Sequence, residues 1–429
     1  MRRLWILCAL CLLALVGMVL LGRAPAAQAA GIVGQGSPGT CTELQFDAAL
    51  EGGGQVTFNC GPAPFTLTVH QKVISGSTTI DGGGLITLSG NDLNRVFSVT
   101  VGGGLYLNNL HVTHGYSSDL LSGGAIYNAG NLVLKNTLID HSQCDSACAG
   151  AAILNTGTVA LYDSTLSQNQ MQIGGALTNL GSGSALILSS TLSLNSSSNP
   201  LSSGGAGFAN RSNAISIMRA SSVVSNSSLS DGGGILNGNL ATLLVVNSTV
   251  SGNTADGNAG GLKNEGSMWL YNATVTNNYS DYNYDGTGTG GGIFNTNDFQ
   301  FRNTILAANW ESFFSNSFGW LAHNGECAGT LTSIGNNLME NYNTSHCTIN
   351  GPFTLTAPLL GPLQFNGGAT LNHLPLPTSP ALNGGNASGC VDNAAETLTL
   401  DQRGFLRFGI CDIGAVERSF RLELPLAQR

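Results

Sequence analysis

Apolar residues recur along the middle of the chain at long, regular intervals. When the repeats are aligned, three columns of equivalent residues, with one residue per repeat in each column, are apolar at every position but one. Two of the columns lie two residues apart within each repeat, and this alternation indicates β-strands. No stretch keeps the 3.6-residue period of an amphipathic helix. The columns are Leu132, Val159, Ala185, Ser216, Leu243, Met268, Phe299; Leu134, Leu161, Ile187, Met218, Val245, Leu270, Phe301; and Ile139, Leu166, Leu192, Val223, Val250, Val275, Leu306.

Gly-rich segments that end in Asn separate these strands. They begin with GGAIYN at 123 and end with GGGIFN at 290. One repeat cannot bury its own apolar column, whereas stacked repeats pair strand on strand about 4.8 Å apart and bury a continuous core. The sequence therefore predicts an all-β fold, a parallel β-helix with about 27 residues per coil. The asparagines, 24 to 31 residues apart, are Asn128, Asn155, Asn179, Asn210, Asn237, Asn264 and Asn295.

The ends of such a stack need covers, because an open coil exposes unpaired strand edges. Residues 42–50 predict a short capping helix, with Thr42 at the N-cap and Glu43 in the first turn. Past about residue 321 the repeat fades. We therefore predict a signal peptide at 1–29, a β-helix with its cap at 30–320, and a loop-rich, disulfide-stapled C-terminal region at 321–429.

The first residues have the pattern of a secretory signal. Arg2 and Arg3 precede an apolar run from Leu4 to Leu21, and Ala27-Gln28-Ala29 offers a small-residue cleavage site. The run is long for a signal peptide, so an uncleaved membrane anchor is the alternative. No later segment has eighteen consecutive apolar residues, and we expect no membrane span after cleavage. The predicted location is secreted or at the cell surface.

Composition and charge narrow the function classes. Apolar residues make up 42% of the 429 residues, enough to fill a core, which excludes an ordinary disordered chain. Only 9% of residues are charged and the formal net charge is −9. An acidic chain with so few Lys and Arg residues has no basic stripe, and we expect no nucleic-acid partner. The oligomeric state is left open by the sequence.

Eight cysteines follow the signal segment. An even number in an exported chain indicates disulfides. Because the cysteines fall in close sequential pairs, we predict bonds Cys41–Cys60, Cys144–Cys148, Cys327–Cys347 and Cys390–Cys411. The alternative is a zinc site at Cys144 and Cys148, which would need two further ligands nearby.

Two parts of the chain carry a family resemblance. Residues 42–61 resemble the N-terminal cap of pectin-lyase-like right-handed β-helices. LTSIGNNL at 331–338, the segment 358–385 and DQRGFLRFGICDIGAVE at 401–417 resemble the choice-of-anchor Q family of exported bacterial β-helix proteins. The resemblance implies a right-handed coil and a surface or secreted location. It implies no single activity, because a fold alone does not confer one.

Candidate catalytic residues lie on two neighbouring coils. Ile139-Asp140-His141 resembles part of the pectate lyase motif WIDH, with Leu138 in place of Trp. His114 and His141 are 27 residues apart, so we expect them to stack about 5 Å apart in adjacent coils. Close histidines beside Asp140 are suited to acid–base work or metal binding. The alternative is an exposed ladder of turn residues.

A candidate calcium site is the segment Asp281-Tyr282-Asn283-Tyr284-Asp285-Gly286. It matches the D-x-N-x-D-G pattern, in which alternate oxygens from Asp281, Asn283 and Asp285 point to one Ca²⁺ ion. The Glu of position 12 is missing. The alternative is a plain Asp/Asn turn in an inserted loop.

Aromatic residues are concentrated between residues 269 and 320. Trp269 and Tyr271 flank Leu270, an inward position, so both are expected to face outward. Together with Trp310 they could stack on sugar rings. The alternative is packing beneath the C-terminal region.

These observations favour a non-enzymatic scaffold that contacts polysaccharide or cell-surface glycan. A Ca²⁺-dependent polysaccharide lyase or glycoside hydrolase is the first alternative, with its site in the groove of coils 105–145. A structural envelope protein is the second. No resident cofactor is predicted with certainty, and Ca²⁺ is the one candidate.

Overall fold

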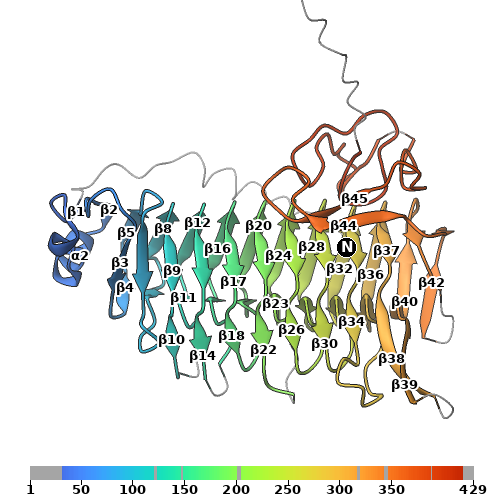
Figure 1. Cartoon of the computed structure of the whole chain (residues 1–429), viewed down its shortest axis with the longest axis horizontal. Helices are drawn as coiled ribbons and strands as arrows, with labels where there is room; N and C mark the ends of the chain where they lie inside the picture. The colour runs from blue at the N-terminus through green and yellow to red at the C-terminus, as the bar shows by residue number, and fades with distance from the viewer. Residues whose placement is uncertain are drawn as a thin grey trace, which may run out of the picture.

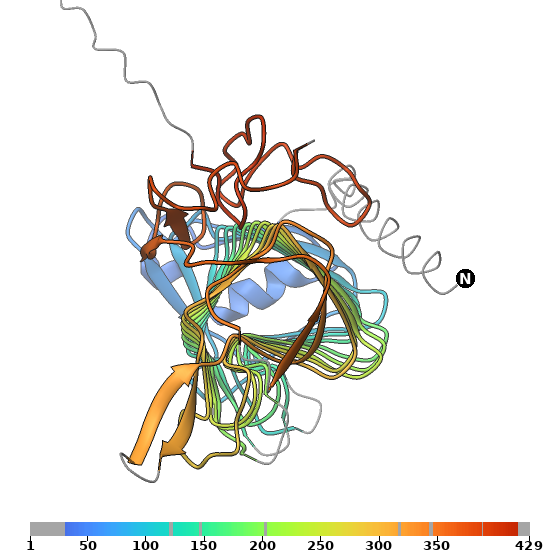
Figure 2. The same ribbon diagram turned by 90° about the vertical axis from the view of Figure 1, so that its right-hand side faces the viewer.

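The computed structural model describes residues 31–119, 123–145, 148–200, 204–315, 319–342, 346–387 and 389–418. The predicted signal peptide at 1–29 lies outside them. The described chain is a parallel β-helix with very little helix, as predicted, and its coils follow one another along one axis (Figure 1). Viewed down that axis, the strands of successive coils superpose and form the walls of a tube (Figure 2).

The largest wall is a sheet of 22 strands, to which most coils contribute a short and a longer strand. The short strands are β1 (Gly31–Val33), β4 (Lys72–Ile74), β7 (Phe97–Val99), β11 (Ile126–Asn128), β15 (Ile153–Asn155), β19 (Leu177–Asn179), β23 (Phe208–Asn210), β27 (Ile235–Asn237), β31 (Leu262–Asn264) and β35 (Ile293–Asn295). The longer ones are β2 (Gly54–Phe58), β5 (Ser77–Asp81), β8 (Gly104–Asn108), β12 (Asn131–Lys135), β16 (Thr158–Tyr162), β20 (Ser184–Leu188), β24 (Ile215–Arg219), β28 (Thr242–Val246), β32 (Ser267–Tyr271), β36 (Asp298–Arg302), β40 (Cys327–Ser333) and β42 (Cys347–Asn350).

A second wall is a parallel sheet of 12 strands, here called sheet B. Its strands are β3 (Phe65–Thr68), β6 (Ile86–Ser89), β9 (His111–Thr113), β13 (Leu138–Asp140), β17 (Thr165–Ser167), β21 (Thr191–Ser193), β25 (Ser222–Val224), β29 (Thr249–Ser251), β33 (Thr274–Thr276), β37 (Ile305–Ala307), β41 (Leu338–Met339) and β43 (Thr354–Leu355). Parallel stacking thus continues beyond residue 320, through β40 to β43.

The third wall is a sheet of nine strands, most of them two residues long. They are β10 (Tyr116–Ser117), β14 (Gln143–Cys144), β18 (Gln170–Met171), β22 (Ser196–Ser197), β26 (Ser227–Ser228), β30 (Thr254–Ala255), β34 (Tyr279–Ser280), β38 (Trp310–Ser315) and β39 (Gly319–Asn324). The last two pair antiparallel and project from the tube as a hairpin (Figure 2).

The predicted apolar columns form the core. Every member of the three columns is at most 1% exposed. Residues from adjacent coils face each other in register, as in Ile139 with Leu166 and Leu166 with Leu192. The one polar member, Ser216, donates its hydroxyl to Asn210 Oδ1 at 2.8 Å, which satisfies it inside the tube.

Two files of buried asparagines run parallel to the axis. In the first, each Nδ2 donates to Oδ1 of the next predicted asparagine, from Asn128 to Asn295, with N···O distances of 2.6 to 3.1 Å. The second file consists of Asn169, Asn195, Asn226, Asn253, Asn278 and Asn309. Both files link the turns of neighbouring coils, and the hydrogen bonds satisfy the buried amide groups.

The N-terminal end is capped as predicted. After the short 3₁₀ helix η1 (Pro38–Thr40), helix α2 (Glu43–Leu50) begins at Thr42, whose Oγ1 accepts a hydrogen bond from the Gln45 N–H. Its Phe46 side chain is fully buried over the first coils. The four predicted cysteine pairs lie at disulfide distance, which confirms the pairing Cys41–Cys60, Cys144–Cys148, Cys327–Cys347 and Cys390–Cys411.

The described residues from 356 to 418 form a C-terminal lobe, which folds back over the middle and last coils (Figure 1). It contains the antiparallel pair β44 (Leu360–Gln364) and β45 (Asn372–Pro375). The lobe reaches the coils through polar contacts. Gln402 Oε1 accepts from the Thr249 hydroxyl at 2.6 Å, and Ser251 Oγ lies 2.9 Å from His373 Nε2.

Candidate functional site

A column of left-handed residues marks the turns between the 22-stranded sheet and sheet B. Asp163 and Ser189 have φ angles of 47° and 49°, a conformation that Asn and Asp tolerate better than most residues. Because every coil turns in the same way, these side chains form a ladder along the flank. Its members include Asn109, Asn136, Asp163, Ser189, Ala220 and Asn247.

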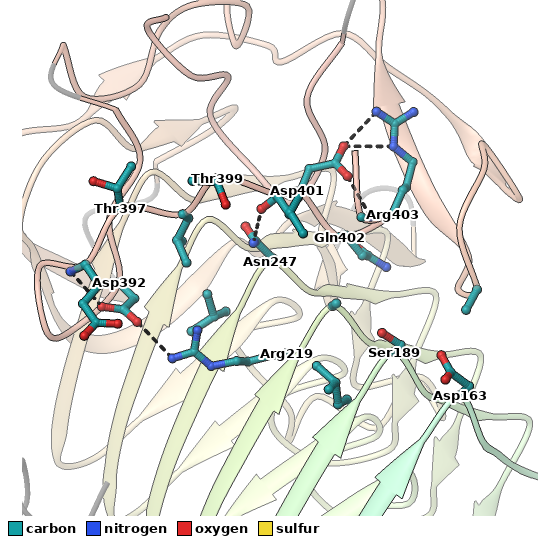
Figure 3. A pocket seen from close by; sticks show the side chains of 18 residues that line it. Asp163, Ser189, Arg219, Asn247, Asp392, Thr397, Thr399, Asp401, Gln402 and Arg403 are labelled. Atoms are coloured by element: carbon teal, nitrogen blue, oxygen red, sulfur yellow. Dashed lines mark hydrogen bonds and ion pairs between the residues drawn. The ribbon is translucent and has the colours of Figure 1, made fainter. Parts of the chain in front are cut away.

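The C-terminal lobe covers part of this ladder and leaves a cavity of about 600 Å³, which we call the lobe groove. Its floor comes from four successive coils and its wall from residues 392–404 (Figure 3). Four coils at about 4.8 Å spacing extend about 14 Å along the axis, so the groove is elongated. The floor carries Asp163, Ser189, Arg219 and Asn247, and the wall carries Asp392, Glu396, Thr397, Thr399, Asp401, Gln402 and Arg403.

Ion pairs hold the charged groups of the lobe groove in place. Arg219 Nη2 lies 3.0 Å from Asp392 Oδ2 and joins the floor to the wall. Arg403 Nη2 lies 2.8 Å from Asp401 Oδ2, and the Asp401 side chain is fully buried. Glu396, Thr397 and Thr399 are exposed on the wall. The lobe groove thus presents hydroxyls and carboxylates to solvent, and the ion pairs of Arg219 and Arg403 hold its floor and wall in place.

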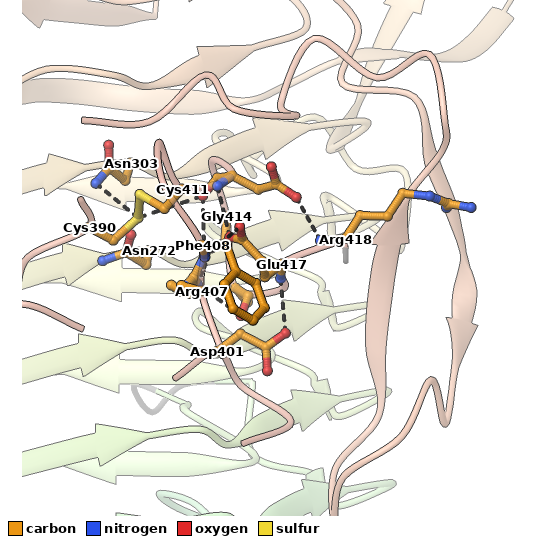
Figure 4. A network of polar contacts seen from close by, with 12 residues as sticks. Asn272, Asn303, Cys390, Asp401, Arg407, Phe408, Cys411, Gly414, Glu417 and Arg418 are labelled. Atoms are coloured by element: carbon orange, nitrogen blue, oxygen red, sulfur yellow. Dashed lines mark hydrogen bonds and ion pairs between the residues drawn. A yellow bond between two sulfur atoms is a disulfide. The ribbon is translucent and has the colours of Figure 1, made fainter. Parts of the chain in front are cut away.

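A buried arginine anchors the lobe behind the groove. The Arg407 guanidinium donates to Asn247 Oδ1 on the coil at 2.9 Å and to Gly414 O at 2.9 Å within the lobe. It also pairs with Glu417 Oε2 at 3.2 Å (Figure 4). Arg407, Gly414 and Glu417 all belong to the segment 401–417. Burial lowers the pKa of Arg407, and the nearby Glu417 opposes that shift.

The candidates Asp140, His141 and His114 lie together on the N-terminal half of the tube. The rings of His114 and His141 stack with centroids 5.5 Å apart, close to the distance expected from the repeat. His141 Nδ1 lies 3.3 Å from Asp140 Oδ1, and His114 Nδ1 lies 3.1 Å from Asp92 Oδ1. Both imidazoles are about half exposed. Both histidines have left-handed φ angles, 50° and 48°, and each lies beside a carboxylate.

The structure adds His111, which sequence reasoning missed. His111 Nε2 lies 2.8 Å from Asp140 Oδ1, and His111 Nδ1 lies 3.2 Å from the Thr87 hydroxyl. Burial raises the pKa of Asp140, but hydrogen bonds from His111 and Thr113 outweigh burial and leave the pKa below its ordinary value. The only available signal was register, because His111 aligns with Thr87 and Leu138 of the adjacent coils.

Thr87 and His111 line a second cavity of about 430 Å³ on sheet B, which we call the sheet groove. Asn109, Asn136 and Asp163 of the turn ladder line it as well. Asp163 also belongs to the lobe groove. The two cavities therefore adjoin at Asp163 and follow the same flank of the tube.

The predicted calcium ligands form an internally bonded turn. Asp281 Oδ1 accepts from the N–H groups of Asp285 and Gly286, each at 3.0 Å. Asn283 Nδ2 donates to Asp285 Oδ2 at 2.8 Å, and Asp285 Oδ1 accepts from Thr287. Burial raises the pKa of Asp281, although the backbone N–H groups oppose it. Ca²⁺ binding here stays a prediction.

The three aromatic candidates do not share a surface. Tyr271 is only 5% exposed and packs outside the tube against Leu244 and Val246, in a cluster that includes Leu398 of the lobe. Trp269 joins the same cluster and is partly buried. Trp310 lies on the nine-stranded sheet and is 37% exposed. Packing beneath the lobe accounts for Tyr271, whereas Trp310 faces a different side of the tube.

Comparisons with known proteins yield no match: no family model, no curated protein and no solved structure resembles the chain closely enough. Within the described part of the chain, no helix has the length and apolar character needed to cross a bilayer. In the same residues, no three His, Cys, Asp or Glu side chains gather as a metal site would require. The four disulfides are compatible with an extracellular protein.

Proposed function

We propose that this protein is an exported β-helix scaffold that binds an extended glycan in the lobe groove. One observation carries the proposal: an elongated cavity of about 600 Å³ runs across four coils and is lined by fixed carboxylates, amides and hydroxyls. Its volume is within the range of ligand sites. The resemblance to exported choice-of-anchor Q and pectin-lyase-like β-helices supports the same location and fold, by analogy only.

The charges of the lobe groove favour a neutral or amino-substituted glycan. Four acidic residues line it, namely Asp163, Asp392, Glu396 and Asp401, against the two arginines Arg219 and Arg403. Both arginines already pair with Asp392 and Asp401. A polyuronate would bring further carboxylates beside Asp163 and Glu396, and like charges repel. This argues against a polyuronate as the ligand of the lobe groove, and we expect no unsaturated product from polyuronates with calcium.

Affinity electrophoresis tests the proposal. The mature protein is run through gels that contain neutral, amino-substituted or uronic polysaccharides. We expect retardation by at least one of the first two classes. Thr399→Trp places an indole into the groove from its exposed wall and is expected to weaken binding at least about tenfold, a loss of about 1.4 kcal/mol.

The matched control is Thr348→Trp, an exposed threonine on β42 of the last coils and outside the lobe groove. It should leave retardation unchanged. Migration of the wild-type chain that no polysaccharide alters would contradict the proposal and favour a structural envelope role. Equal retardation of Thr399→Trp and wild type would place binding elsewhere.

A further inference from the structure

Three polar side chains on successive coils of sheet B form a continuous hydrogen-bonded relay. The Oγ1 atom of Thr87 on β6 lies 3.2 Å from Nδ1 of His111 on β9. His111 Nε2 lies 2.8 Å from Asp140 Oδ1 on β13. The order hydroxyl, imidazole, carboxylate is the one that activates a hydroxyl nucleophile in acyl-transfer enzymes, here with the two ring nitrogens exchanged relative to the Ser-His-Asp triad.

The partners of His111 decide which ring nitrogen carries the proton. An ionised Asp140 can only accept, so Nε2 carries the hydrogen and donates it. His111 Nδ1 is then the acceptor for the Thr87 hydroxyl. The Asp140 side chain is 11% exposed and the His111 side chain is 33% exposed. The orienting carboxylate is thus shielded while the base is open to solvent.

The same positions of other coils show that the fold does not require these groups. In register with Thr87 and His111 stand Leu138, Thr165 and Thr191. In register with Asp140 stand Thr113, Ser167 and Ser193. Leucine and small hydroxyl residues therefore suffice for strand pairing here. A buried carboxylate also carries a desolvation cost that the smaller residues at these positions avoid. Strand pairing alone therefore does not explain why Asp140 and His111 stand here.

The relay is accessible to a ligand. Thr87 and His111 both line the sheet groove of about 430 Å³. The sheet groove adjoins the lobe groove at Asp163, which lines both. A glycan in the lobe groove that extends toward the N-terminal coils would bring its substituents to Thr87.

We propose that Thr87, His111 and Asp140 form an acyl-transfer site that removes O-acyl groups from such a glycan, an inference whose glycan part rests on the proposed function. The Thr87 oxygen forms a bond to the ester carbonyl carbon while its proton passes to His111 Nδ1. The bond between that carbon and the sugar oxygen breaks, and His111 returns the proton to the departing alkoxide. Water then attacks the acyl-threonine with His111 as base, which releases the carboxylic acid and restores Thr87.

Two ester probes test this site on the mature protein. p-Nitrophenyl acetate reports acyl transfer without any need for glycan binding, and O-acetylated xylan reports release of acetate from a polysaccharide. We expect turnover of both, and mass spectrometry of acid-quenched samples should find the Thr87 peptide one acetyl group heavier. Thr87→Val keeps the shape but lacks the hydroxyl, and His111→Gln keeps a bridging amide without a base. Each should lower the rate at least about 100-fold.

The controls separate chemistry from structure. Thr191→Val changes the same column four coils from Thr87, outside both grooves, and should keep the wild-type rate. Thr87→Ser should retain activity. Absence of turnover in the folded wild type, or a wild-type rate in Thr87→Val, would overturn the acyl-transfer site. Hydrolysis of p-nitrophenyl acetate without retardation in glycan gels would instead overturn the proposed glycan binding alone.

Discussion

Glu326 ends the second asparagine file with an ionisable group. The Asn309 side-chain amide donates to Glu326 Oε2 at 2.6 Å, while Glu326 Oε1 has no hydrogen-bond partner among the described residues. Burial raises the pKa of Glu326 to about 8, although the hydrogen bond from Asn309 opposes it. The carboxyl is therefore mostly protonated at neutral pH in the folded state.

This shift predicts a stability that falls with rising pH. Below the unfolded pKa near 4.5 the carboxyl is neutral in both states, so its ionisation does not reduce the free energy of unfolding. Between that value and about 8 the unfolded chain releases a proton that the folded chain keeps, so the free energy of unfolding falls. Chemical denaturation at pH 5, 7 and 9 should show a loss of a few kcal/mol in wild type. Glu326→Gln should remove most of it, and an equally steep loss in that variant would contradict the assignment.

At the scale of elements, the strands and their inward columns follow from the sequence, because a 27-residue repeat brings like residues into register. The 27-residue spacing also predicted that His114 stacks on His141, whereas Asp140 and His141 were first singled out by their resemblance to the pectate lyase motif. His111 and Thr87 escaped because they lie 24 residues apart and in coils before the clear repeat begins. The calcium pattern was visible, but the inward hydrogen bonds of Asp281 depend on loop conformation, which the pattern does not encode.

The asparagine files predict a cooperative element. Asn253→Ala removes the link between Asn226 and Asn278, and both neighbours lose buried partners. An unsatisfied buried polar group costs about 1–3 kcal/mol, so we expect a loss of about 2–4 kcal/mol in denaturant unfolding. Asn136→Gly is the control, because Asn136 belongs to the exposed turn ladder and Gly retains its left-handed φ of 48°. A loss no larger than that of the control would show that the buried files do not support the stack.

At the scale of the whole molecule, the lobe folds back on coils far away in sequence. Gln402 meets Thr249 across 153 residues, and no repeat or spacing foretells such a contact. The sequence therefore predicted a disulfide-stapled C-terminal region but not where this region packs on the coils. The lobe groove, which depends on that packing, could not be predicted either. The position of the lobe also explains why the Tyr271 side chain, which points outward from its strand, is covered by the lobe and does not face solvent.

Arg407 tests this docking. Arg407→Met leaves Glu417 buried without its ion-pair partner and removes the bond to Asn247. Loss of one partner of a buried pair costs about 3–5 kcal/mol. Limited proteolysis should then cleave the lobe while the coils resist, and glycan retardation should fall. Arg302→Met, which removes a half-buried arginine of β36 outside the lobe, should leave the cleavage pattern unchanged. A lobe that resists proteolysis in Arg407→Met as it does in wild type would contradict the anchoring role of Arg407.

The most direct test of the account is hydrogen–deuterium exchange with and without the polysaccharide that retards the protein best. Glycan in the lobe groove predicts slower exchange in peptides that cover 392–404 and the turns at 163, 189, 219 and 247. Protection confined to the nine-stranded sheet around Trp310, with none in these peptides, would contradict it.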